Sequence, residues 1–330
     1  MTARHEVGTE PTQAHATIRV VYIAGSGRSG STILDRMLGQ LDGWFSVGEL
    51  VNLWERGLIA GRKCGCGVPV PQCPLWTAVL GRAFGAPGGV DARRMALLAR
   101  RRVRPGSLPP LLAARGRKVA ADGDEYRATL ARLYRAVHDH TGCHVIVDSS
   151  KSPVYGELLA TLPGAEVFVV HLVRDPRATA YSWLRQKRLP DFGDGRLMLR
   201  QPPLVSARRW VLWQTGTELL WRRRPERYLR LRYEDVMGAP RPALRRIAAL
   251  VDEPPPWLPF TSDRVVRLEA THSVSGNPSR FRTGEVELVP DSEWMRAMRS
   301  ADWTLVTAAT WPWLLRYRYP LRRRRRARGT

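Results

Sequence analysis

Short apolar segments that alternate with segments of helical spacing dominate the chain. β-Strands are predicted at residues 19–24, 144–147, 167–173 and 228–232. Helices are predicted after them at 33–38, from Pro153, through 178–183 and at 240–251, with a longer helix at 205–222. The segment 167–173 is apolar apart from one histidine, which is typical of a parallel strand covered on both faces. The alternation predicts an α/β fold, a doubly wound and mainly parallel sheet with helices on both faces.

The same pattern suggests how the chain is divided. Residues 18–320 are expected to form one domain, preceded by a flexible leader at 1–17 and followed by a basic tail at 321–330. Within the domain, residues 61–123 mix cysteines, Pro and Gly turns and arginine-rich helical stretches. They predict an insertion of helices and loops that does not bind the nucleotide and lies on the acceptor side of the site.

The composition adds a strong positive charge to this picture. The 330 residues include 53 basic and 30 acidic side chains, a net charge of +23, and only four of the basic ones are lysines. This excess favours anionic ligands such as nucleotides, sulfated or phosphorylated substrates and anionic lipid. No base-reading motif is present, so no specific nucleic-acid partner is expected. The basic run at residues 322–328 predicts a solvated tail that can contact an anionic membrane peripherally. Oligomeric state is not predicted.

The location of the protein is predicted from two further segments. Residues 1–17 lack the apolar core of a secretory signal. The apolar stretch 303–315 is too short to span a membrane and contains Pro312, so it predicts a packing helix. A cytoplasmic location is therefore expected.

A glycine-rich loop follows the first predicted strand. Residues 25–32 are Gly-Ser-Gly-Arg-Ser-Gly-Ser-Thr, and a strand, glycine turn and helix start in this order favour a phosphate or sulfate. Against the pattern G-x-x-x-x-G-K-[ST], the glycines are Gly25 and Gly30, but Ser31 occupies the lysine position and the cation is Arg28. This displacement argues for an anion other than a nucleoside triphosphate with magnesium.

A second anion site is predicted after the third strand. Arg174 stands at the strand end and Ser182 lies eight residues on, inside the next predicted helix. An arginine fork and a serine hydroxyl can converge on one oxyanion. Two separated sites imply a ligand with phosphate groups at both ends.

Together, these motifs resemble those of the sulfotransferases that use 3′-phosphoadenosine 5′-phosphosulfate (PAPS). Residues 25–32 resemble the family's 5′-phosphosulfate loop in its arginine-bearing form, and residues 174–182 resemble its 3′-phosphate motif. The resemblance implies a P-loop type sheet and the transfer of a sulfuryl group, without a required metal, from PAPS to a hydroxyl of a carbohydrate, lipid or other small acceptor. The residues it assigns to PAPS binding are Gly27, Arg28, Ser29, Gly30, Ser31, Thr32, Arg174, Ser182 and, in a closing loop at 276–281, Arg280.

The resemblance also indicates catalytic residues. Related enzymes with the arginine-type loop place a glutamate where Glu49 stands, and a carboxylate with a raised pKa can act as the base. His171 is the rival base, although a core histidine is the more common role of such a residue, and His272 is a further candidate. Lys151 and Arg28 are expected to neutralise the leaving phosphate oxygen. The alternative for Lys151 is a salt bridge to Asp148 or a surface position after a helix cap.

Several interpretations stay open. Asp148 resembles the acidic strand end of a triphosphatase, which leaves a nucleotide or small-molecule kinase as an alternative, and a non-catalytic basic protein that only binds an anion is a third possibility. Tyr233 and the carboxylates after it are interpreted as structural. Trp210, Trp213 and Trp221 either flank an acceptor or belong to the core.

The cysteines form a group of their own. Cys64, Cys66 and Cys73 fit a reduced, turn-rich loop that shapes the acceptor pocket, or a disulfide between Cys64 and Cys73. A zinc site fits less well, because structural zinc usually takes four ligands in paired spacings, so no metal is predicted.

Overall fold

A parallel five-stranded sheet forms the centre of the protein. The structure is a computed structural model and describes residues 17–323 apart from 87, 114–123, 187 and 192–195. In the sheet the strand order is β2-β3-β1-β4-β5, and every neighbouring pair is parallel. Its strands are β1 (Ile18–Gly25), β2 (Trp44–Gly48), β3 (Val145–Lys151), β4 (Ala165–Val173) and β5 (Tyr228–Arg232). The predicted parallel α/β fold is confirmed.

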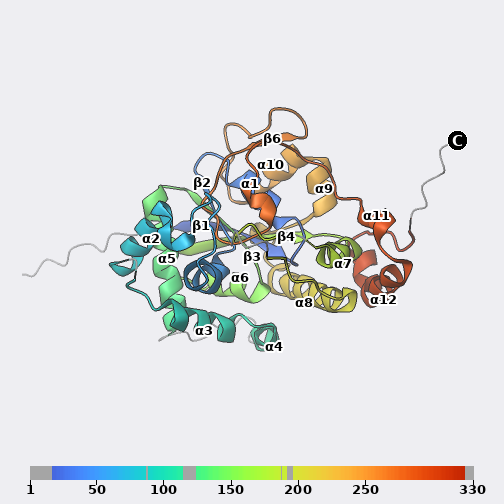
Figure 1. Cartoon of the computed structure of the whole chain (residues 1–330), viewed down its shortest axis with the longest axis horizontal. Helices are drawn as coiled ribbons and strands as arrows, with labels where there is room; N and C mark the ends of the chain where they lie inside the picture. Colours follow the sequence, from blue (N-terminus) through green and yellow to red (C-terminus); the bar gives the residue numbers. More distant parts are fainter. Residues whose placement is uncertain (1–16, 87, 114–123, 187, 192–195, 324–330) are drawn as a thin grey trace, which may run out of the picture.

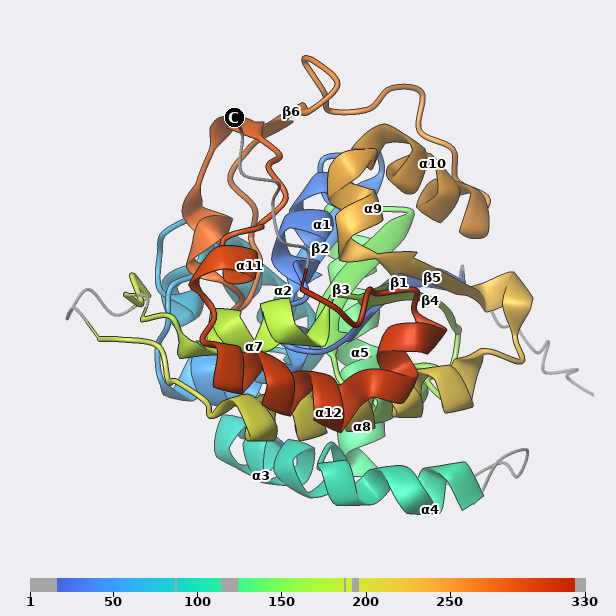
Figure 2. The ribbon, with the colours of Figure 1, turned by 90° about the vertical axis from the view of Figure 1, so that its right-hand side faces the viewer.

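Helices cover both faces of this sheet (Figure 1). One face carries α1 (Ser31–Leu38), α9 (Tyr233–Gly238) and α10 (Pro240–Leu250), and the other carries α5 (Glu125–Thr141), α6 (Pro153–Leu159) and α8 (Pro203–Trp221). Because side chains alternate along a strand, β1 supplies both cores: Val21 and Ile23 pack on the first face, Val20 and Tyr22 on the second. At one edge, α7 (Pro176–Leu184) and α12 (Ser300–Arg316) pack with α8 (Figure 2), and α11 (Trp294–Ala297) packs against α7.

The strand β2 is the main element that the sequence pattern missed. Only five residues long, it follows α1 after a short turn, begins after Gly43 and ends at Gly48, and both glycines have a positive φ. Such a short segment gives little periodicity to detect. Its position matters, because Glu49 follows it directly at the carboxyl edge of the sheet, where ligands of open α/β folds bind.

The predicted insertion contains three α-helices in its described part. These are α2 (Pro74–Phe84), which packs against α5, α3 (Ala92–Arg102), and α4 (Leu108–Ala113). α3 packs against η2 (Leu53–Ile59), a π-helix that follows the short 3₁₀ turn η1 (Leu50–Asn52).

A small antiparallel pair, β6 (Val265–Leu268) and β7 (Gly284–Glu287), brackets a long loop at residues 269–283. The short 3₁₀ helix η6 (Pro278–Phe281) within that loop contacts α1. The loop therefore returns to the amino end of the chain's first helix.

The ends of the chain are only partly described. Of the predicted leader 1–17 and the basic tail 321–330, the described part includes Thr17 and residues 321–323. The apolar stretch 303–315 lies in the packing helix α12, as predicted. None of the helices in the described part of the chain combines the length and apolar character that crossing a lipid bilayer requires.

Candidate functional site

The glycine-rich loop is a tight turn between β1 and α1. Gly30, the residue before α1, has a φ of 91°, and a Cβ there would lie 2.4 Å from the ring of Tyr233. Gly25 has a φ of 142°, and a Cβ there would lie 2.4 Å from the carbonyl oxygen of Leu172. Only glycine fits both positions. The first backbone N–H groups of α1 have no partner within the helix and, together with the helix dipole, favour an anion.

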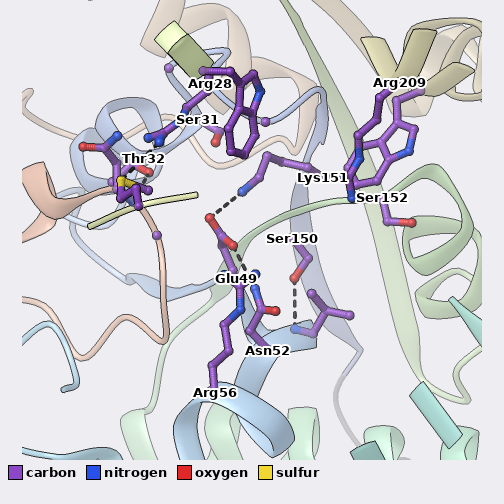
Figure 3. Close-up of a pocket in the computed structure, with 18 of the residues that line it drawn as sticks. Arg28, Ser31, Thr32, Glu49, Asn52, Arg56, Ser150, Lys151, Ser152 and Arg209 are labelled. Atoms are coloured by element: carbon purple, nitrogen blue, oxygen red, sulfur yellow. Dashed lines mark hydrogen bonds and ion pairs between the residues drawn. The ribbon is translucent and has the colours of Figure 1, made fainter. Parts of the chain in front are cut away.

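One cavity of about 530 Å³ brings most of the predicted site residues together (Figure 3). Its wall includes Gly27, Arg28, Gly30, Ser31 and Thr32 of the loop, together with Glu49, Lys151, Arg174 and Ser182. Ser29 does not line it: its side chain is fully buried, and its hydroxyl has no hydrogen-bond partner within the described residues. The two anion sites predicted separately thus share one cavity.

Arg28 is held in an unusual backbone conformation at the cavity wall. Its φ is 68°, a region that non-glycine residues rarely adopt and that often marks functional sites. The guanidinium lies over the Trp183 ring at 4.7 Å, and Nη2 is 3.1 Å from the sulfur of Met198. Burial, with further contributions from Arg185 and Arg174, lowers the pKa of Arg28. This desolvated positive charge favours an anion in the cavity.

Arg174 reaches the phosphate loop itself. Its Nη1 donates to the carbonyl oxygen of Arg28 at 2.9 Å, and its Nη2 forms an ion pair with Asp291 at 3.0 Å. The guanidinium lies 4.4 Å from the centre of the Tyr233 ring. Tyr233 was interpreted from sequence as structural, but it lines the cavity and supports both Arg174 and Gly30. The contact of Tyr233 with Gly30 joins the end of β5 to the loop after β1. The two residues are far apart in sequence, so no local sequence pattern predicts this contact.

Glu49 and Lys151 form a buried ion pair in the cavity wall. Glu49 Oε1 lies 2.6 Å from Lys151 Nζ, and Oε2 accepts a hydrogen bond from Asn52 at 2.8 Å (Figure 3). Burial alone would raise the pKa of Glu49, but the charges of Lys151 and Arg56 outweigh it, so the pKa lies below its usual value. A raised pKa, which the sequence analysis named as the condition for a base, is therefore not found for Glu49 in this structure. Glu49 is a carboxylate at neutral pH.

Lys151 ends β3 with a φ of 71°, so it is a second non-glycine residue of the cavity wall, after Arg28, with a positive φ. Its Nζ also donates to the carbonyl oxygen of Ser149 at 2.9 Å. A salt bridge to Asp148, considered from sequence, does not form, because Asp148 is fully buried and accepts from the Ser150 N–H at 2.7 Å and from the Tyr134 hydroxyl. Lys151 therefore does not pair with Asp148, and it lines the cavity.

His171 is a core residue and not a base. It is fully buried in β4, its Nδ1 is 2.7 Å from the Tyr228 hydroxyl, and its Nε2 contacts Gln214. It does not line the cavity. Burial lowers the pKa of His171 to about 4, so the ring is neutral at physiological pH. The prediction of His171 as a rival base is wrong, because no substrate can reach it.

The buried His171 predicts a pH dependence of stability. Because its folded-state pKa of about 4 lies below the unfolded value near 6.5, the unfolded chain binds a proton that the folded chain does not. The stability that neutral His171 contributes is therefore present above the unfolded-state pKa and is lost as the pH falls towards the folded-state pKa. Between pH 7 and pH 5, the unfolding free energy of the wild type should fall by about 2 kcal/mol more than that of His171→Asn. Urea denaturation at both pH values measures this, and equal pH dependences would contradict it.

Arg280 also differs from its predicted role. It is buried, and its guanidinium donates to the carbonyl oxygens of Ser273 at 3.0 Å and Lys63 at 2.7 Å and pairs with Asp191 at 3.0 Å. It does not line the cavity, whereas Asn277 in the same loop does. Arg280 was expected to bind the nucleotide, but it instead connects the 269–283 loop to Lys63, the residue before Cys64. Its partners are distant in sequence, so the spacing could not reveal them.

Other parts of the cavity wall come from η2, α3 and α8. The side chains there are partly apolar, including Trp213 and Val103, and partly cationic, including Arg56 and Arg209. Arg209 lies 5.0 Å from the Trp213 ring centre. Trp210 and Trp221 are buried in the core, so only one of the three tryptophans considered from sequence lines the cavity. The helix α3 belongs to the predicted insertion 61–123, which therefore contributes to this wall.

The cysteines lie outside the cavity. Cys64, Cys66 and Cys73 are free thiols, and no disulfide joins Cys64 to Cys73. His272, the further candidate for the base, is beside them, with Nδ1 3.2 Å from the sulfur of Cys73. None of these four residues lines the cavity, so His272 is not placed to act as the base.

Comparisons with known proteins show the family to which the chain belongs. A model described as "Sulfotransferase family" matches residues 21–257, and no curated protein matches the chain. A sulfotransferase domain from the curacin biosynthetic pathway is 18% identical with a TM-score of 0.52, covering 93% of this chain and 100% of that one. The sulfotransferase domain of the Synechococcus PCC 7002 olefin synthase is also 18% identical, with a TM-score of 0.49 and coverage of 91% and 98%. The curacin domain shows a shared fold, and because the family model spans most of the sequence, the chain belongs to the sulfotransferase family.

Proposed function

We propose that this sulfotransferase moves the sulfuryl group of PAPS to a hydroxyl group of an acceptor. The observation that carries the proposal is the meeting of two arginines, Arg28 and Arg174, in one cavity with the buried pair of Glu49 and Lys151. Cations suited to a ligand with two phosphate groups lie in the same cavity as a carboxylate that can accept a proton.

The cavity residues fit such a donor. The Nε atoms of Arg28 and Arg174 are both buried without a hydrogen-bond partner among the described residues. Buried donors of this kind are costly unless a ligand satisfies them. Gly27, Ser31 and Thr32 add the amino end of α1 to the same wall. The loop lacks a lysine for the outer phosphates of a triphosphate, which favours PAPS over a nucleoside triphosphate with magnesium.

In the proposed reaction, PAPS supplies a sulfuryl group attached to a good phosphate leaving group. Glu49 accepts the proton of the acceptor hydroxyl as its oxygen bonds to sulfur, and the bond from sulfur to the phosphate oxygen breaks. The products are a sulfate ester, adenosine 3′,5′-bisphosphate and the proton carried by Glu49. Lys151 and Arg28 stabilise the negative charge that develops on the departing phosphate oxygen.

The ion pair of Glu49 and Lys151 couples proton acceptance by Glu49 to stabilisation of the leaving group by Lys151. In this structure Lys151 lowers the pKa of Glu49, which keeps the carboxylate deprotonated but weakens it as a base. If Lys151 turns from Glu49 towards the departing phosphate oxygen, its charge no longer lowers the pKa of Glu49. Glu49 then becomes a stronger base when the donor is bound, because its burial is no longer offset by the same charge.

The acceptor is inferred from the remaining cavity wall. Trp213 and Val103 offer an apolar surface, while Arg56 and Arg209 offer positive charge beside it. We infer a hydroxyl-bearing acceptor with an apolar body and an anionic group, of the lipid, carbohydrate or other small-molecule classes.

A calorimetric titration tests the donor assignment. Adenosine 3′,5′-bisphosphate should bind the protein with the same affinity with and without added magnesium, in buffer free of chelator, because the proposed contacts are arginines and backbone N–H groups. ATP with magnesium should bind much more weakly. Tight ATP binding that requires magnesium, with no binding of the bisphosphate, would contradict the proposal and support a kinase.

A further inference from the structure

Three cysteines and one histidine converge on one point outside the cavity. Cys64 and Cys66 lie in the loop after η2, Cys73 is the residue before α2, and His272 comes from the loop between β6 and β7. Their ligand atoms, three sulfurs and one ring nitrogen, all lie within 4.8 Å of one another. The sequence suggested only three ligands, because the fourth is 199 residues beyond Cys73.

Three distances between ligand atoms of this cluster lie within a few tenths of an ångström of the edges of a tetrahedral zinc site. The sulfurs of Cys66 and Cys73 are 3.7 Å apart, and His272 Nδ1 lies 3.2 Å from the sulfur of Cys73 and 3.9 Å from that of Cys64. Bond lengths of about 2.3 Å to sulfur and 2.0–2.1 Å to nitrogen give tetrahedral edges of about 3.8 Å and 3.6 Å. A disulfide would use two of the sulfurs and leave the convergence of the other two ligands unexplained.

We propose that Cys64, Cys66, Cys73 and His272 bind one structural zinc ion. Three thiolates and an imidazole are a common ligand set of structural zinc, and thiolates select against magnesium, calcium and manganese. Cys64 and Cys73 are buried and the other two ligands are half-buried, so the four-coordinate site leaves no open position for a substrate. Binding releases the three thiol protons, and the resulting complex carries one negative charge.

Hydrogen bonds hold together the two segments that carry the ligands. The N–H of Cys64 donates to the Val68 carbonyl at 2.7 Å, and that of Gly65 donates to the Ser273 carbonyl at 3.0 Å. The indole N–H of Trp76 donates to the carbonyl oxygen of His272 at 2.8 Å. The insertion and the distant loop are therefore paired where the four ligands meet.

The zinc ion would join the insertion to a loop that supports the cavity. Two residues after His272, the Val274 carbonyl accepts from the N–H of Glu49 at 2.7 Å. Farther along the loop, the N–H of Asn277 donates to the Thr32 hydroxyl at 3.2 Å. The metal thus stabilises the positions of Glu49 and the phosphate loop without touching the substrate.

Metal analysis of the full chain, purified in reducing buffer without chelator, tests the proposal. We expect one zinc per chain by elemental analysis. Cobalt in place of zinc should give the intense visible bands of a tetrahedral site and a thiolate-to-metal charge-transfer band. Cys66→Ser and His272→Asn should lower the zinc content and the melting temperature. Cys143→Ser is the matched control, because Cys143 is also a free, buried thiol but lies outside the cluster, and it should keep one zinc.

Three outcomes would overturn the proposal. The first is a folded wild type that holds only traces of metal, with the three thiols open to alkylation or joined in a disulfide. The second is a full complement of iron or copper in place of zinc. The third is zinc that stays in the chain while a mercurial reagent modifies Cys64, Cys66 and Cys73. This last measurement uses the wild type, so it decides the matter even if a ligand variant fails to fold.

Discussion

Glu49→Gln is expected to lower kcat by roughly 10²–10⁴ while leaving the affinity for adenosine 3′,5′-bisphosphate nearly unchanged. A glutamine side chain has the same shape and its oxygen can still accept the hydrogen bond from Lys151, but it cannot take a proton from an acceptor hydroxyl. Lys151 also keeps its bond to the carbonyl oxygen of Ser149, so its position should change little. Steady-state kinetics with any accepted hydroxyl substrate, combined with calorimetry, separates the two effects.

The control for this variant is Glu226→Gln, which changes an exposed carboxylate far from the cavity wall and should leave kcat unchanged. The wild-type pH profile adds a second measurement. Because the charges of Lys151 and Arg56 outweigh burial and lower the pKa of Glu49, the acid limb of kcat/KM for PAPS, which reports on the enzyme before the donor binds, should lie below the ordinary glutamate value. Full activity of Glu49→Gln, or an acid limb near the usual histidine value of about 6.5, would assign the base to another residue.

Much of the fold could be predicted because its main signals are local. The apolar segment 167–173 lies within β4, and the glycine-rich loop sits between a strand and a helix, as expected. Arg28 and Arg174 can be found for the same reason, since each lies in the loop that follows a strand predicted from the hydrophobic pattern. In parallel sheets the carboxyl ends of the strands meet at one edge, so residues that share this position tend to share a site.

The remainder depends on contacts between distant segments, which periodicity does not encode. His171 and Arg280 carry the right chemistry, but neighbours from other elements, among them Gln214 and Asp191, place both side chains in the interior. Conversely, the roles of Tyr233 and His272 depend on neighbours that are distant in sequence, Gly30 for Tyr233 and the three clustered cysteines for His272. The direction in which the pKa of Glu49 shifts could not be read from the sequence, because its ion-pair partner Lys151 is 102 residues away.

Arg174→Ala is expected to weaken binding of adenosine 3′,5′-bisphosphate by about 1.5–3 kcal/mol, or roughly 10- to 150-fold, the usual worth of hydrogen bonds to charged groups. The alanine variant loses a guanidinium that lines the cavity and also its bond to the carbonyl oxygen of Arg28. Arg174→Lys should bind with intermediate affinity, because lysine keeps the charge but not the planar fork. Calorimetry measures all three proteins, and unchanged affinity in the alanine variant would remove Arg174 from the site.

Asp291→Asn separates a phosphate contact from the mere loss of an ion pair. Both Arg174→Ala and Asp291→Asn break the pair between these two side chains, but only the first removes the cation. In the asparagine variant Arg174 retains its bond to the Arg28 carbonyl, and a carboxylate that competes with the bound anion is gone. Its affinity for the bisphosphate should therefore rise or stay the same. If Asp291→Asn weakens binding as much as Arg174→Ala does, the ion pair only maintains the shape of the loop, and Arg174 does not bind the nucleotide.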